Sequence, residues 1–105
     1  MNEISVTELA DDAVLLDVRE PDEFAAGHAE NAVHVPLGMV PARVADLPSV
    51  DGPLPVICRS GGRSAHAAMW LESNGIAAVN VAGGMQDWQA KGKAMVSDGD
   101  TPTVL

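Results

Sequence analysis

Short apolar runs alternate with helix-like segments along the whole chain. Four runs have the length of a strand and little alternation of apolar and polar positions: residues 13–18, 32–35, 54–58 and 77–81. Runs of this kind are typical of strands that are covered on both faces. Helix signals lie between them and after the last one, at residues 21–27, 40–47, 64–74 and 85–91. This order predicts an α/β domain with a mostly parallel central sheet and helices on both faces.

Local signals mark where several of these helices begin and end. Pro21 suits the first turn of a helix, and Gly27 and Gly75 suit the residue just after one. Val40, Val44 and Leu47 are spaced four and three apart, as on one face of a helix. The run Ser5-Val6-Thr7-Glu8 has the form of a capping box and predicts one more short helix near the start of the chain.

The chain has 105 residues and 47% apolar residues, enough for one domain with a core of its own. We assign residues 1–96 to this domain. Residues 97–105 are rich in Asp, Gly, Thr and Pro, which predicts a flexible C-terminal tail. One cysteine cannot form an internal disulfide, and no Cys/His cluster has zinc spacing, so we expect neither a metal nor a cofactor.

The net charge of −9 is concentrated in acidic side chains of the first third of the chain, where only Arg19 opposes them. Such a surface repels nucleic acid and anionic lipid, so we expect neither as a partner. It serves solubility or docks a basic partner protein. No apolar run is long enough to span a membrane, and the acidic N-terminus does not resemble a secretory signal. We therefore expect a cytoplasmic protein, present as a monomer or weak dimer.

The segment from Cys58 to Ser64 concentrates the candidate chemistry. Cys58 ends a predicted strand at the sheet edge where α/β proteins bind ligands. Gly61 and Gly62 let the following loop curl tightly, so that its N–H groups form an anion-binding nest ahead of a helix N-terminus. Two of the six basic residues, Arg59 and Arg63, flank this loop. A thiol in that environment should have a lowered pKa and act as a nucleophile. The alternatives are an inert buried cysteine and a nest that binds an anion without reacting.

The length of the loop separates the remaining candidates. Cysteine phosphatases place five residues between cysteine and arginine, which would put the arginine at position 64. Here Arg63 comes one residue earlier, position 64 is Ser64, and Ile57 stands where those phosphatases usually carry histidine. A smaller ring suits a terminal sulfur better than a phosphoryl group. The lack of a second cysteine also argues against a thiol-cycling arsenate reductase.

Three segments in order resemble the single-domain members of the rhodanese family, over nearly the whole chain. The first is Leu16-Asp17-Val18-Arg19-Glu20-Pro21-Asp22-Glu23-Phe24, continued by Gly27-His28, Asn31-Ala32 and Pro36. The second is Cys58-Arg59-Ser60-Gly61-Gly62-Arg63-Ser64, and the third is Gly83-Gly84-Met85-Gln86-Asp87-Trp88. Ala29-Glu30 departs from the family pattern, in a loop away from the chemistry.

The resemblance implies a five-stranded sheet and a sulfurtransferase. Cys58 would be the catalytic residue, taking sulfur from a small anionic donor such as thiosulfate and holding it as a persulfide. The acceptor would be a thiol, a partner protein or, in an assay, cyanide. The substrate-binding residues would be those of the loop: Arg59, Ser60, Gly61, Gly62 and Arg63. Arg63 would bind the substrate or brace the loop.

Five further residues are predicted to support the site. Asp17 and Arg19 fit a structural ion pair better than a catalytic one. His28 is expected to brace a loop, with proton transfer as the alternative. Ser64 supports the loop, and Trp88 packs in the core or lines the pocket. A sulfur relay or docking module that is loaded by a partner protein remains the second functional hypothesis.

Overall fold

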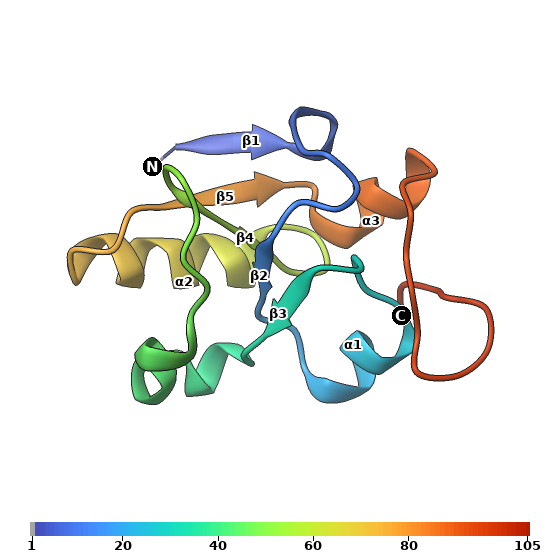
Figure 1. Cartoon of the computed structure of the whole chain (residues 1–105), viewed down its shortest axis with the longest axis horizontal. Helices are drawn as coiled ribbons and strands as arrows, with labels where there is room; N and C mark the ends of the chain where they lie inside the picture. The colour runs from blue at the N-terminus through green and yellow to red at the C-terminus, as the bar shows by residue number, and fades with distance from the viewer. Residues whose placement is uncertain (1) are drawn as a thin grey trace.

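Five parallel strands form the centre of the protein in the computed structural model, which describes residues 2–105. The strand order across the sheet is β1-β5-β4-β2-β3. Figure 1 shows β1 at one edge, β3 at the other, and the tips of β1 and β5 pointing toward α3. The strands are β1 (Glu3–Ser5), β2 (Leu15–Asp17), β3 (Ala32–His34), β4 (Leu54–Ile57) and β5 (Ala78–Ala82).

Within the described part of the chain, two α-helices and three short 3-10 segments connect the strands, and a third α-helix follows β5. The α-helices are α1 (Pro21–Ala26), α2 (Gly62–Ser73) and α3 (Gly84–Ala90). The 3-10 segments are Val6–Glu8, Leu37–Met39 and Pro41–Asp46. Among residues 2–105 no helix has the length and apolar character needed to cross a membrane.

The core lies in two layers because neighbouring strand residues point to opposite faces of the sheet. Leu16, Val56 and Cys58 face α2 and pack with its residues Ala67 and Leu71. Leu15, Ile57 and Val81 face the other way and pack with Met85 and Trp88 of α3. The predicted α/β fold with helices on both faces is confirmed, and every strand pairing in it is parallel.

Two sequence predictions differ from the observed elements. The hydrophobic pattern gave four strands, whereas the structure adds β1, whose three residues hold a single large apolar side chain and are ordered by pairing with β5. The helix predicted over residues 40–47 is wrong. This stretch contains only a 3-10 segment, Pro41–Asp46, broken at Arg43 by non-helical dihedral angles. The dihedral angles of Arg43, φ −119° and ψ 27°, divide the stretch into two short turns, and Leu47 before Pro48 is extended and ends it.

The segment after Val96 returns to α1. Val96 forms a backbone bridge with His28, and the N–H groups of Asp98 and Thr103 donate to the carbonyls of residues 25 and 26 at 3.0 and 2.9 Å. A Cβ atom on Gly27 would lie 2.4 Å from the Thr103 carbonyl oxygen, so the close approach requires glycine there. The predicted flexibility of residues 97–105 stays a prediction.

Replacing Gly27 by alanine is expected to release this segment. The backbone of Gly27 is extended, with φ 174°, so alanine adds no backbone strain and acts only through its contact with Thr103. We expect faster hydrogen exchange at the amides of Asp98 and Thr103, with little change in Tm. Gly38→Ala is the control, because a Cβ there meets no atom within 4 Å. Equal exchange in both variants would contradict the contact.

Candidate active site

Cys58 follows the last residue of β4 and its side chain is almost completely buried, with 1% exposure. β4 lies between β5 and β2, so the cysteine emerges at the centre of the carboxyl edge of the sheet. The loop 59–61 then leads directly into α2, which begins at Gly62. The sequence prediction of a strand end, a tight loop and a helix N-terminus around the cysteine therefore matches the observed backbone.

The first turn of α3 fixes the direction of the peptide groups that follow Cys58. The N–H groups of Met85 and Gln86 donate to the carbonyl oxygens of Cys58 and Arg59 at 2.8 and 2.9 Å. In a trans peptide the N–H points opposite to the carbonyl, so the N–H groups of Arg59 and Ser60 point away from α3. The carbonyl groups thus face the helix, and the N–H groups are left for an anion.

Gly84 allows this close approach. A Cβ atom at position 84 would lie 2.4 Å from the Cys58 carbonyl oxygen and 2.7 Å from that of Arg59. Its φ of +56° also lies in the left-handed region that glycine adopts without strain. The Gly83-Gly84 pair of the third motif is therefore part of the site, although residues 83 and 84 were not among the predicted site residues.

The Cys58 sulfur receives hydrogen bonds from two neighbours. The Gly61 N–H donates to Sγ at 3.1 Å, from a backbone with φ +116°, and the Ser64 hydroxyl lies 3.2 Å from Sγ. Burial raises the pKa of the thiol, but hydrogen bonds from Ser64, Gly61 and Ser60 outweigh it, so the pKa of Cys58 is lowered overall. Hydrogen bonds that lower the pKa of a thiol favour its thiolate form, which is the nucleophilic one.

Arg63 is held by Glu23 of α1 in a two-pronged ion pair. Its two terminal nitrogens lie 2.7 and 2.9 Å from the two carboxylate oxygens of Glu23. Hydrogen bonding to Arg63 lowers the pKa of Glu23 to about 2, and the same contact raises the pKa of Arg63. Between the two predicted roles of Arg63, this geometry favours bracing the loop against α1.

The other predicted loop residues lie on the outer surface. Arg59, Ser60 and Gly62 are exposed. The Arg59 Nε donates to the carbonyl oxygen of Leu105 at 2.7 Å, which places the end of the described chain beside the loop. Arg59 is thus the cation of the loop that is available to a substrate in solution.

Asp17 and Arg19 form a fully buried ion pair below the loop. The Arg19 NH2 group lies 2.8 Å from the Asp17 carboxylate, and neither side chain is exposed. Arg19 also donates to the carbonyls of Glu23 and Gly27 at 3.3 and 2.8 Å. The pair therefore ties the end of β2 to Glu23, the residue of α1 that pairs with Arg63, and to Gly27 just after this helix. The contacts fit the structural role that the sequence predicted.

His28 and Trp88 lie away from the sulfur. The His28 ring stacks on Phe24 at 3.7 Å between centroids, and its Nδ1 lies 2.6 Å from the Phe24 carbonyl oxygen. Trp88 is fully buried on the α3 face of the sheet and donates its indole N–H to Ala94. Their contacts fit the predicted bracing and packing roles.

Sequence reasoning missed two polar residues that complete the site, Glu23 and Asn80. Asn80 lies in β5 with 1% exposure, and its Oδ1 is 2.5 Å from the Ser64 hydroxyl. A single asparagine inside a run of valine and alanine is the signal that could have revealed it, because a buried amide needs hydrogen-bond partners. Glu23 carried no such signal, since its partner is 40 residues away in the sequence.

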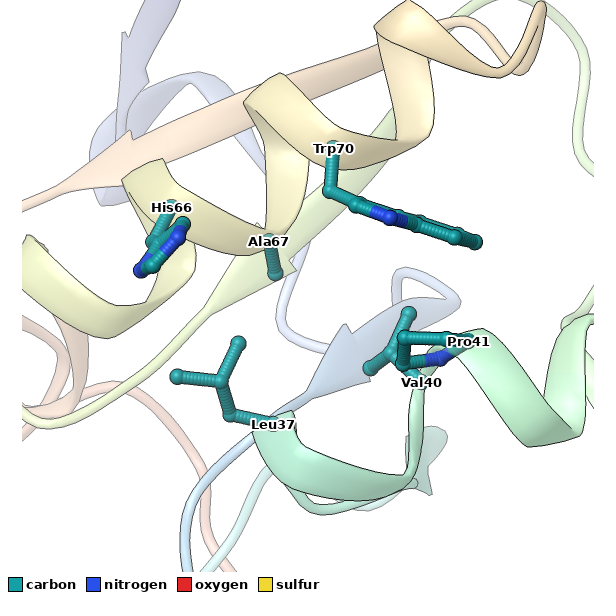
Figure 2. Close-up of a pocket in the computed structure, with 6 residues that line it drawn as sticks. All are labelled: Leu37, Val40, Pro41, His66, Ala67 and Trp70. Atoms are coloured by element: carbon teal, nitrogen blue, oxygen red, sulfur yellow. The ribbon is translucent and has the colours of Figure 1, made fainter.

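An apolar pocket of about 160 Å³ lies beside the site (Figure 2). It opens between α2 and the segment that follows β3, and it is lined by Leu37, Val40, Pro41, His66, Ala67 and Trp70. The lining includes no residue of the loop 58–63, so this pocket is separate from the anion-binding loop.

Glu23→Gln tests the ion pair with Arg63 through its pH dependence. Because the folded-state pKa of Glu23 lies near 2, below its ordinary value of 4.5, the pair stabilises the fold above pH 4.5 and loses this effect as the pH falls toward 2. We expect a loss of about 1–2 kcal/mol at neutral pH that becomes small by pH 2, where the Glu23 carboxylate is half protonated in the folded state. The measurement is urea unfolding across this range.

Asp46→Asn is the matched control, because its pair with Arg43 is more exposed, with side-chain exposures of 58% and 35%. A loss in Glu23→Gln that stays constant from neutral pH to pH 2 would contradict the assignment.

Gly84→Ala tests the contact between α3 and the loop. The added Cβ pushes the Cys58 and Arg59 carbonyls away from the helix, so the N–H groups opposite them turn out of the loop. We expect the pKa of Cys58 to rise toward its ordinary value, and a loss of about 2–3 kcal/mol in unfolding free energy. The pH dependence of alkylation by iodoacetamide reports the thiol pKa.

Gly92→Ala is the control for backbone strain. Gly92 also has a positive φ, +69°, but a Cβ there meets no atom within 4 Å, so alanine adds strain without a new contact. If both variants shift the thiol pKa equally, the contact with the Cys58 carbonyl is not what orients the loop.

Comparison with known proteins places this geometry in a family. The family model described as "Rhodanese-like domain" matches residues 5–91. A putative sulfurtransferase of Bacillus subtilis is 38% identical over 86 residues, 82% of each chain. A putative sulfur carrier protein of the same organism is 42% identical over 78 residues, which are 73% of this chain and 42% of the relative. The crystal structure of a rhodanese-related protein from Thermoplasma volcanium matches with a TM-score of 0.81 and 32% identity, covering 91% of this chain and 98% of the other. The chain therefore belongs to the rhodanese-like domain family.

Proposed function

We propose that the protein transfers sulfur through a persulfide on Cys58. The observation that carries this proposal is the combination at one atom of a lowered thiol pKa and hydrogen bonds from the Gly61 N–H and the Ser64 hydroxyl. Membership of the rhodanese-like domain family and the names of its relatives support sulfur transfer as the general activity. The identities of the sulfur donor and of the sulfur acceptor are a more specific part of the proposal.

In the first step the Cys58 thiolate attacks the outer sulfur of thiosulfate or of a related sulfane donor. A bond forms between Sγ and that sulfur, and the bond to the sulfite group breaks. Sulfite leaves with the bonding electron pair, and the negative charge of the thiolate is replaced by that of the outer sulfur. The N–H groups of the loop hold this charge, and Arg59 offers the exposed cation that meets the anionic donor.

In the second step an acceptor thiolate attacks the outer sulfur of the persulfide. The new bond takes the sulfur to the acceptor, and Sγ leaves as a thiolate with the electrons of the broken S–S bond. Cyanide serves as the acceptor in an assay and leaves as thiocyanate. The enzyme returns to its starting state without a cofactor, a metal or an external redox reagent.

A sulfur relay is the second candidate, and two observations favour it. One relative is named a putative sulfur carrier protein. In addition, Arg63 is occupied by Glu23, which leaves Arg59 as the exposed arginine of the loop for a small dianion. A very high KM for thiosulfate, together with rapid loading from a protein persulfide, would favour the relay over the small-molecule enzyme.

We further propose that the protein works in the cytoplasm, because a reactive thiol without a disulfide partner persists best in a reducing compartment. Its partners would be a small anionic sulfur donor and a thiol or protein acceptor, and the protein would act as a monomer or weak dimer.

Intact mass after incubation with thiosulfate tests the proposal. We expect the wild type to gain the mass of one sulfur atom and to lose it on addition of cyanide. Cys58→Ser removes the nucleophile and should gain nothing. Turnover of an aryl phosphate, or a wild type that stays unmodified by every sulfane donor tried, would count against the persulfide.

A further inference from the structure

The Ser64 hydroxyl stands between Cys58 and a buried amide in the neighbouring strand. Its oxygen lies 2.5 Å from Asn80 Oδ1, 3.2 Å from Cys58 Sγ and 3.2 Å from the Gly61 carbonyl oxygen. Ser64 is fully buried and Asn80 has 1% exposure, so water does not replace these partners. A hydroxyl carries one hydrogen, so it can donate fully to only one of the three acceptors at a time.

The amide of Asn80 is fixed in one orientation. Its Nδ2 donates to the Glu3 carboxylate at 3.0 Å and to the Gly61 carbonyl oxygen at 3.2 Å. Glu3 pairs with Asn80 across the β1–β5 ladder, so the two side chains stand side by side on the same face of the sheet. A flipped amide would turn Oδ1 toward two oxygen acceptors. Asn80 therefore presents its oxygen, and not its nitrogen, to Ser64.

The preferred acceptor of the Ser64 hydrogen depends on the charge of the sulfur. When Sγ is a neutral thiol or the inner atom of a persulfide, the Asn80 oxygen is the stronger acceptor. When Sγ is a thiolate, the charged sulfur attracts the hydroxyl, because hydrogen bonds to ionised groups are the stronger ones. We propose that Asn80 is a positioning residue that holds the Ser64 hydroxyl away from a neutral sulfur and releases it to Sγ when the thiolate forms.

This inference rests on the proposed function where it concerns turnover. In the second step the S–S bond breaks and its electron pair stays on Sγ. As that charge appears, the Ser64 hydroxyl donates its hydrogen bond to the departing thiolate instead of to Asn80. No proton is transferred in this step. Asn80 thus restricts the hydrogen bond to Sγ to the states that carry charge on this atom, and its competition for the hydroxyl limits how far the thiolate is stabilised.

Charged groups from four elements surround this arrangement. Glu3 comes from β1, Arg63 from α2, Glu23 from α1 and Arg59 from the loop. Arg63 interacts with the charge of Cys58 at longer range. The carboxylate of Glu23 balances the positive charge of Arg63. None of these four side chains bonds to the Ser64 hydroxyl among residues 2–105. The effects of these four charged groups on the pKa of Cys58 should therefore be the same with and without the Ser64 hydroxyl.

A double-mutant cycle of Asn80→Leu and Ser64→Ala tests the proposal, with the thiol pKa measured from the pH dependence of alkylation. Asn80→Leu removes the nearer of the two competing acceptors and leaves only the Gly61 carbonyl, so the Ser64 hydroxyl donates more often to Sγ and the pKa of Cys58 should fall by about half a unit or more. In the Ser64→Ala background the same replacement should leave the pKa unchanged. Asn80→Ala repeats the test with a smaller side chain if leucine prevents folding.

The cycle has two outcomes. A fall in the pKa that depends on the Ser64 hydroxyl supports the assignment. Equal shifts in both backgrounds, a rise that needs the hydroxyl, or no shift at all would overturn it. Val81→Ala is the control for loss of packing in β5, because Val81 points to the opposite face of the sheet and contacts the α3 layer.

The rates of sulfur transfer to Cys58 (loading) and from Cys58 (discharge) are measured separately. A purely structural role of Asn80 would not change these two rates in opposite directions. With the thiol fully ionised, Asn80→Leu should slow loading, because a less basic thiolate is a weaker nucleophile, and should speed discharge, because it is a better leaving group. Slowing of both steps would overturn the proposal. Since alkylation needs no sulfur donor, the pKa cycle remains valid if Cys58 takes up no sulfur, so failure of the proposed function is seen separately.

Discussion

Two hydrogen bonds from the first turn of α3 to the carbonyl groups of Cys58 and Arg59 determine which way the loop faces. They are possible because β5 lies next to β4, so the chain leaving β5 meets the chain leaving β4 at the same edge of the sheet. Gly84 then lets the two backbones come together without a side chain between them. The nest, the low thiol pKa and the place of Ser64 all follow from this arrangement.

The site stabilises a negative sulfur in a chain whose net charge is −9. It does so mainly with oriented N–H and hydroxyl groups, since the charge of Arg63 is balanced by Glu23. The backbone N–H groups among these donors are fixed dipoles, so they need no reorganisation to hold a negative sulfur.

The sequence predicted the fold class and Cys58 as the centre of the site because both rest on local signals. Apolar runs mark the strands β2 to β5, and the loop lies within seven consecutive residues. β1 was not predicted from the sequence because its strand conformation depends on pairing with β5. The stretch at residues 40–47 was predicted as a helix from the spacing of Val40, Val44 and Leu47, and it forms only the 3-10 segment Pro41–Asp46. Glu23 and Gly84 could not be assigned to the site, since their roles depend on contacts between segments that only the folded sheet brings together, whereas Asn80 stands out in the sequence as a polar residue within an apolar run.

The contact between Arg59 and Leu105 has a practical consequence for work with this protein. All five strands start at one edge of the sheet, where Glu3 opens β1, while Leu105 ends beside the loop at the opposite edge. An affinity tag joined before residue 3 therefore starts on the side of the sheet away from the sulfur. A tag or an acceptor domain joined after Leu105 starts within reach of Arg59, where it competes with substrates or, in a designed fusion, receives the sulfur directly.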